Sequence, residues 1–78
     1  MIELFMLEFC GYCKKVMSYM DEHSIPYKTI DISEKANEEE LIRIGGKRQV
    51  PFLLDRDKKV EMYESNDILE YLREEYQG

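Results

Sequence analysis

The start of the chain restricts the fold more than any other stretch. Residues 2–7 place apolar side chains on both faces of an extended segment, which is typical of a central, buried strand. Residues 12–23 follow with the i, i+3, i+4, i+7 spacing that predicts an amphipathic helix with one inward face. That face consists of Cys13, Val16, Met17 and Met20. A buried strand that runs directly into a helix indicates an α/β domain.

The middle of the chain predicts a second strand and a short helix. Residues 27–32 have the composition of a strand and begin just after a proline turn. Asn37 and Glu40 resemble a capping box, which predicts that a helix opens at this point. Gly45-Gly46 is typical of a helix C-terminus and predicts where this helix ends.

The remaining segment predicts a hairpin followed by a last helix. Residues 51–54 and 59–62 predict two strands across a tight turn. Ser65 is placed to cap the helix that follows. The inner face of that helix would consist of Ile68, Leu69, Leu72 and Tyr76.

The predicted order β-α-β-α-β-β-α defines the fold class, with one α/β domain spanning residues 1–78. The first two strands are joined by a helix and should therefore be parallel, with a right-handed crossover. The hairpin adds antiparallel strands. We expect a four-stranded mixed sheet with helices on both faces.

Charge and hydropathy exclude several classes of function. The formal net charge is −6 at pH 7, so the chain is not expected to bind nucleic acid. The N-terminal stretch lacks the basic region and cleavage site of a signal peptide. No apolar run is long enough to predict a membrane span. We expect a cytoplasmic protein, in which reducing conditions disfavour a purely structural disulfide.

Cys10 and Cys13 carry the chemistry. A closed structural zinc site needs four ligands, whereas this chain offers two cysteines and one histidine, so no metal is expected. The junction between strand and helix favours the thiolate form of Cys10, because helix N-terminal N–H groups attract negative charge. Lys14 and Lys15 add positive charge nearby. The pattern predicts a redox dithiol in which Cys10 attacks and inward-facing Cys13 resolves the mixed disulfide.

A second informative stretch surrounds Val50-Pro51. A proline that opens a strand indicates either an edge position or a cis bond. In the predicted fold this loop lies beside the dithiol. A cis proline would leave the Val50 backbone unpaired, and an extended peptide can pair with such an edge.

Three motifs in order resemble the glutaredoxins of the thioredoxin-fold superfamily: Cys10-Gly11-Tyr12-Cys13, Val50-Pro51 and Glu64-Ser65-Asn66-Asp67. The resemblance covers nearly the whole chain and implies a thioredoxin-like fold. The third motif, with Glu64 followed by Ser65, is also similar to the N-terminal half of glutathione transferases. Those proteins usually carry a further helical domain.

The resemblance implies a glutathione site. Tyr12 would flank the glutathione sulfur, the Val50 main chain would hydrogen-bond the peptide backbone, and cis Pro51 would shape the turn. The γ-glutamyl end would lie at the start of the last helix, where N–H groups bind its carboxylate and a side-chain carboxylate pairs with its amine. The residues implied there are Ser65, Asn66 and Asp67. Read without the resemblance, the same three residues predict a simple N-cap with an acidic first turn.

Two positions depart from the glutaredoxin pattern. Gly11 stands where many members have proline, which loosens the turn between the cysteines. Leu7 stands where many members have a lysine that meets the glycine carboxylate of glutathione. The candidates to replace that lysine are Lys47, Arg48 and Gln49.

The predicted function is a monomeric glutaredoxin-like thiol–disulfide oxidoreductase that acts on protein disulfides or glutathione mixed disulfides. It would need no cofactor beyond a thiol supply, from glutathione or another small thiol. The alternative is a dimeric [2Fe–2S] carrier, in which Cys10 of each protomer and two glutathiones supply the four thiolates. A third interpretation is a binding module with an idle dithiol.

Overall fold

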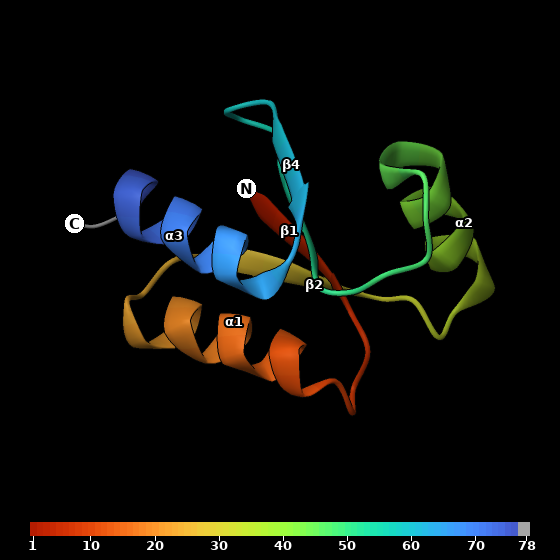
Figure 1. Ribbon diagram of the computed structural model, residues 1–78, viewed down its shortest axis with the longest axis horizontal. Helices are drawn as coiled ribbons and strands as arrows, with labels where there is room; N and C mark the ends of the chain where they lie inside the picture. Colours follow the sequence, from red (N-terminus) through yellow and green to blue (C-terminus); the bar gives the residue numbers. More distant parts are fainter. Residues whose placement is uncertain (77–78) are drawn as a thin grey trace.

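The computed structural model describes residues 1–76 and consists of three helices and one sheet (Figure 1). The elements in chain order are β1 (Ile2–Met6), α1 (Gly11–Glu22), β2 (Tyr27–Asp31), α2 (Lys35–Gly45), β3 (Phe52–Asp55), β4 (Val60–Tyr63) and α3 (Ser65–Glu75). The longest helix, α1, has 12 residues. Within residues 1–76, every helix is too short or too polar to cross a lipid bilayer.

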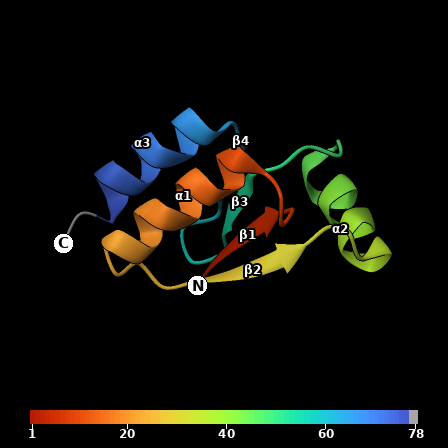
Figure 2. The same cartoon turned by 90° about the horizontal axis from the view of Figure 1, so that it is seen from below.

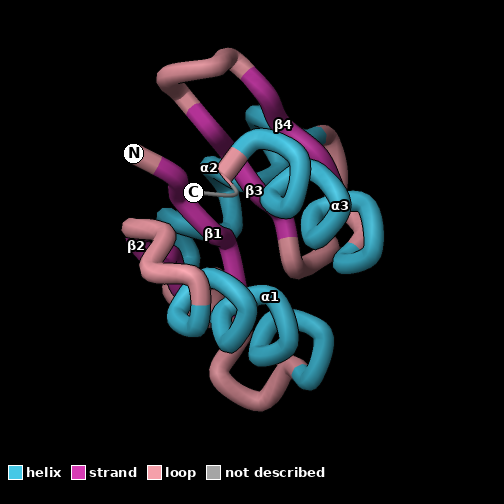
Figure 3. The backbone as a smooth tube through the Cα atoms, turned by 90° about the vertical axis from the view of Figure 1, so that its left-hand side faces the viewer, coloured by secondary structure: helices cyan, strands magenta, loops and turns pink. Residues whose placement is uncertain are grey.

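The four strands form one mixed sheet in the order β2-β1-β3-β4 (Figure 3). β1 pairs with β2 in parallel, with Ile2 opposite Tyr27, and with β3 in antiparallel fashion, with Ile2 opposite Asp55. β4 completes the hairpin with β3. The predicted order of elements, the parallel first pair and the hairpin are therefore confirmed.

Helices cover both faces of the sheet, as the apolar pattern of residues 2–7 predicts. α1 and α3 lie side by side on one face, whereas α2 lies on the other (Figures 1 and 2). One core cluster, with Leu4 of β1, contains Val16 and Met20 of α1 and Ile68 and Leu72 of α3. The second cluster joins Leu41 of α2 to Phe5, Ile32, Phe52 and Leu54. β1 is buried on both sides because its alternate side chains enter different clusters.

Two predicted helix starts are wrong. α2 begins at Lys35 with Glu34 as its N-cap, so Asn37 lies inside the first turn and not at the cap. Its side-chain amide instead donates to the backbone oxygen of Asp31 at 2.9 Å, which ties the helix to the end of β2. α3 has Glu64 as its N-cap, so Ser65 is the first helical residue and does not cap it.

The strands of the hairpin begin one residue later than predicted. β3 starts at Phe52, and Pro51 stays outside the ladder because proline has no N–H to donate. The Val50-Pro51 peptide bond is cis, one of the two alternatives that the sequence left open.

Tyr63 fixes the loop that leads from α2 to Pro51. Its hydroxyl donates to the backbone oxygen of Lys47 at 2.7 Å. The same hydroxyl packs so closely against Gly45 that a Cβ at that position would collide with it. α2 ends at Gly45, and its C-cap Gly46 has a φ of 93°, a left-handed conformation that glycine adopts freely. These contacts hold the loop between Gly46 and Pro51 near the start of α3.

Candidate functional site

Cys10 occupies the N-cap position of α1. The turn after β1 is closed by a hydrogen bond from the Cys10 N–H to the Leu7 backbone oxygen at 3.2 Å. The Cys10 Sγ accepts a hydrogen bond from the Cys13 N–H at 3.1 Å. A sulfur that accepts a backbone N–H at a helix N-terminus is well placed to carry negative charge. The geometry therefore suits the Cys10 sulfur to attack a disulfide, because it is partly exposed at the start of the helix.

Cys13 lies in the buried face of α1, as the helical pattern predicts. Its side chain is fully buried, whereas Cys10 is partly exposed, and both residues are free thiols. Burial and a hydrogen bond to Cys10 raise the pKa of Cys13 to about 12. Cys13 is therefore protonated at neutral pH, and solvent reaches mainly Cys10.

This difference predicts selective alkylation. Iodoacetamide at neutral pH should add one carbamidomethyl group to the folded protein, on Cys10, because Cys13 is buried and protonated. Unfolding in guanidinium chloride should allow two. Peptide mapping after short exposure gives the site directly. Equal labelling of Cys13 in the folded protein would contradict the geometry.

A groove of about 440 Å3 opens beside the dithiol, which we call the Tyr12 groove. It brings together the start of α1, the loop before β3 and the start of α3, three segments that are far apart in the sequence. Its lining consists of Tyr12, Gln49, Val50, Pro51, Glu64, Ser65, Asn66 and Asp67. Every residue that the sequence assigned to glutathione binding thus lies in one groove, together with Gln49 from the three candidate replacements for the lysine.

The start of α3 forms the polar end of the Tyr12 groove. The first N–H groups of any α-helix lack an intrahelical acceptor, and no side chain caps α3. Glu64, at the N-cap, has a φ of 72°, an unusual value for a residue with a side chain. The Gln49 amide donates to its carboxylate at 3.0 Å. The groove therefore offers N–H donors for an anion next to carboxylates for a cation.

Glu64 is the groove residue to which the sequence gave no role of its own. Glu64 is part of the Glu64-to-Asp67 motif, but neither its backbone conformation nor its contact with Gln49 follows from the local sequence pattern. Both depend on how the loop before β3 meets α3 in the folded chain.

Lys47 and Arg48 lie outside the lining of the Tyr12 groove. The Lys47 ammonium lies 4.8 Å from the centre of the Tyr63 ring, and the Arg48 guanidinium pairs with the carboxylate of Glu38. Both cations therefore contact residues of the protein, whereas Gln49 faces the groove.

Comparison with protein families places these features in context. The sequence model of the glutathione S-transferase N-terminal domain matches residues 4–78. A curated relative is the N-acetyl-S-hydroxy-L-cysteine reductase of Bacillus subtilis, which is 37% identical over 43 residues. That match covers 54% of this chain and 46% of the relative. The chain spans less than half the length of the curated relatives that it matches.

Solved structures show the same fold. A thioredoxin-like protein superposes with a TM-score of 0.79 at 17% identity, covering 95% of this chain and 96% of its own. A complex of buckwheat glutaredoxin with glutathione superposes with a TM-score of 0.74 at 22% identity, covering 94% of this chain and 68% of its own. The predicted thioredoxin-like fold is confirmed.

Proposed function

The chain belongs to the family of glutathione S-transferase N-terminal domains, and we propose that it is a glutaredoxin-like thiol–disulfide oxidoreductase that uses glutathione. One observation carries the proposal. Cys10 is partly exposed at the N-terminus of α1, and the thiol of Cys13, three residues later, is buried. The Tyr12 groove beside them offers both N–H donors and carboxylates. The structural similarity to a glutaredoxin that was solved with glutathione supports the choice of thiol.

Glutathione fits the chemistry of the Tyr12 groove. Its central peptide would pair with the main chain of Val50, which precedes the cis bond to Pro51. The carboxylate of its γ-glutamyl group would meet the free N–H groups at the start of α3, near Ser65 and Asn66. Its amine would pair with Asp67. Tyr12 would then cover the sulfur beside Cys10.

The proposed reaction starts with the Cys10 thiolate. It attacks one sulfur of a disulfide, the S–S bond breaks, and the other sulfur leaves as a thiolate that takes a proton from water. When the attacked sulfur belongs to glutathione, a second glutathione can release the protein. When it belongs to a protein, Cys13 gives up its proton and attacks Cys10, which leaves a Cys10–Cys13 disulfide. In both routes two electrons pass to the substrate, and no cofactor is needed.

The alternative function, a [2Fe–2S] carrier, fits the donor set less well. A cluster of this type needs four thiolates. Cys10 is the accessible cysteine of each chain, because Cys13 is buried and its pKa is raised to about 12. Two protomers would therefore supply two of the four thiolates, and two glutathione molecules would supply the other two. Disulfide exchange needs one chain and one accessible thiolate, and we favour it for that reason.

The Asp67→Asn variant tests the glutathione assignment. A charge-assisted hydrogen bond should become a neutral one, so kcat/KM for a glutathionylated peptide should fall by about tenfold. The matched control is Asp57→Asn, an exposed carboxylate in the hairpin turn beside the N-terminus. Coupled turnover with glutathione and glutathione reductase measures both. Equal activity of the two variants would show that the start of α3 does not hold the γ-glutamyl group.

A further inference from the structure

Phe9 is an apolar side chain that lies almost entirely outside the core. It directly precedes Cys10, and it is 89% exposed. An exposed aromatic ring forgoes the free energy that burial of its apolar surface would contribute. Contiguous exposed apolar surface rimmed by polar residues is typical of interaction sites, and Phe9 lines one groove together with Leu7 and Cys10. Phe9 is therefore available to a molecule that approaches the Cys10 sulfur.

A second groove, of about 320 Å3, lies along this residue, and we call it the Phe9 groove. Its lining consists of Leu7, Glu8, Phe9, Cys10, Asp31 and Ser33. The sheet order explains its place. The end of β2 lies on one side of β1, and the loop before β3 lies on the other. The Phe9 groove and the Tyr12 groove therefore flank the β1–α1 loop on opposite sides, and Cys10 itself lines the Phe9 groove.

The Phe9 groove is lined by both apolar and acidic residues. Leu7 and Phe9 provide the apolar part, and Glu8 and Asp31 provide two carboxylates. The Asp31 carboxylate accepts the backbone N–H of Ser33 at 2.9 Å. Hydrogen bonds from Ser33 lower the pKa of Asp31, so it is ionised at neutral pH. The net charge of −6 gives the chain as a whole a negative electrostatic potential, which also favours the approach of a cationic segment.

We propose that the Phe9 groove receives the segment next to the target cysteine in a protein disulfide, and that it selects segments with an apolar residue and a lysine or arginine. The apolar residue would pack on Leu7 and Phe9, and the cation would face Asp31 and Glu8. Glutathione has neither an apolar side chain of this size nor a lysine or arginine side chain. The inference rests on the proposed function, and it assigns glutathione and the protein substrate to separate grooves.

The reaction step is the first half of the dithiol route. The Cys10 thiolate attacks the target sulfur, the partner sulfur leaves with the electron pair of the broken S–S bond, and the segment stays joined to Cys10. Cys13 then attacks the Cys10 sulfur, the segment leaves as a thiolate, and the proton of Cys13 passes to it. The dithiol is oxidised by two electrons, and the target disulfide is reduced by two.

Three short peptides test this selection on the Cys13→Ser variant, which stops after the first step. The peptides are Leu-Cys-Lys, Leu-Cys-Glu and Gly-Cys-Gly, each activated as a mixed disulfide with thionitrobenzoate. Release of the coloured thiolate gives the rate of attack by Cys10. The leaving group is the same in each case, so rate differences report the flanking residues.

We expect Leu-Cys-Lys to react about fivefold faster than Leu-Cys-Glu. Asp31→Asn should reduce that ratio to about twofold. Asparagine keeps the oxygen that accepts the Ser33 N–H, so only the charge is lost. Asp57→Asn should leave the ratio unchanged. Phe9→Ala should slow Leu-Cys-Lys by about threefold relative to Gly-Cys-Gly, because the apolar contact is lost.

Equal rates for the three peptides in every variant would overturn the selection, while a glutathione adduct on Cys10 would leave the proposed function intact. If no disulfide, including that of glutathione, reacts with Cys10, both proposals are wrong.

Discussion

Replacing Cys10 by serine is expected to lower thiol–disulfide exchange by at least about 10³-fold. A serine hydroxyl stays protonated at neutral pH and cannot form a mixed disulfide. The fold should not change, because serine is a favourable N-cap residue. Its oxygen can accept the Cys13 N–H that Cys10 Sγ accepts now. The loss should therefore be chemical, with the melting temperature within about 2 °C of that of the wild type.

Turnover of a glutathionylated peptide and thermal unfolding monitored by circular dichroism measure the two quantities. Cys13→Ser is the matched control, since it removes a buried thiol and leaves Cys10 in place. It should retain exchange with glutathione mixed disulfides and lose the reduction of protein disulfides. Substantial activity in Cys10→Ser would mean that another group is the nucleophile.

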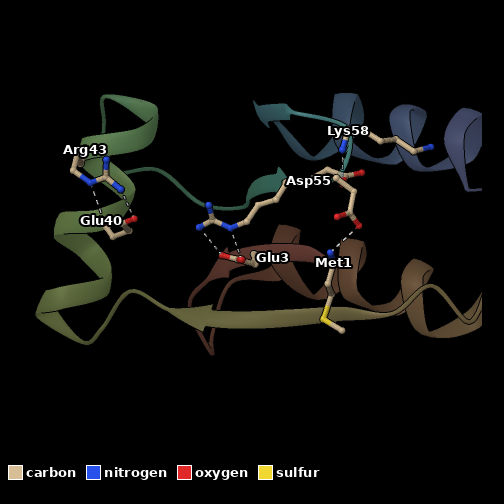
Figure 4. Close-up of polar contacts among 8 residues, drawn as sticks. Met1, Glu3, Glu40, Arg43, Asp55 and Lys58 are labelled. Atoms are coloured by element: carbon tan, nitrogen blue, oxygen red, sulfur yellow. Dashed lines mark hydrogen bonds and ion pairs between the residues drawn. The ribbon is translucent and has the colours of Figure 1, made fainter.

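The second large effect is expected at Asp55, far from the dithiol. This carboxylate is fully buried at the end of β3. It accepts the Tyr71 hydroxyl at 2.7 Å and the Tyr76 hydroxyl. It also accepts the Lys58 N–H at 3.4 Å (Figure 4). It thereby joins the hairpin to α3. Burial and Asp55 raise the pKa of Tyr76 to about 12, so that hydroxyl keeps its proton and donates.

Asp55→Ala should lower the free energy of unfolding by about 2–4 kcal/mol, because two tyrosine hydroxyls and one N–H lose their acceptor. This is a large share of the total of about 5–15 kcal/mol that is typical of small domains. Urea unfolding monitored by circular dichroism measures the change. Asp57→Asn, an exposed carboxylate two residues away, should cost less than about 1 kcal/mol. Similar costs for the two variants would contradict the role of the buried cluster.

The effect of Asp55 should also depend on pH. Burial opposes its charge, but the hydrogen bonds from Tyr76 and Tyr71 outweigh burial and lower the pKa of Asp55 below 3.8. The folded state therefore favours the ionised form more than the unfolded state does. The stabilisation is present above the unfolded pKa, near 3.8, and is lost as the pH falls through the lower folded value. The difference between wild type and Asp55→Ala should accordingly shrink below about pH 4. A difference that stays constant into this acid range would be inconsistent with the lowered pKa.

The sequence predicted the order of elements and the two-sided burial of β1 because both follow from local periodicity. Leu4 and Phe5 enter different core clusters, as their alternation requires. The start of α2 was missed because the Asn37 amide finds a tertiary acceptor at the end of β2, which outweighs its local preference for a cap. Cap motifs compete with contacts that the sequence alone does not show.

The same contrast between local pattern and tertiary contact applies to the candidate site. The three motifs were readable as short patterns, and the fold brings Tyr12, Val50 and Asp67 to one groove. The positions of Lys47 and Arg48 were not predictable, because they depend on Tyr63 and Glu38. The Phe9 groove was not predictable either, since it requires that Asp31 lie beside the β1–α1 loop.

The most direct test of the central proposal is the intact mass of the Cys13→Ser variant after mixing with a glutathionylated peptide. We predict rapid addition of one glutathione, on Cys10, and no addition when Cys10 is also changed to serine. Reaction with other disulfides but no glutathione adduct would contradict glutathione as the co-substrate. The start of α3 would then be only a helix terminus.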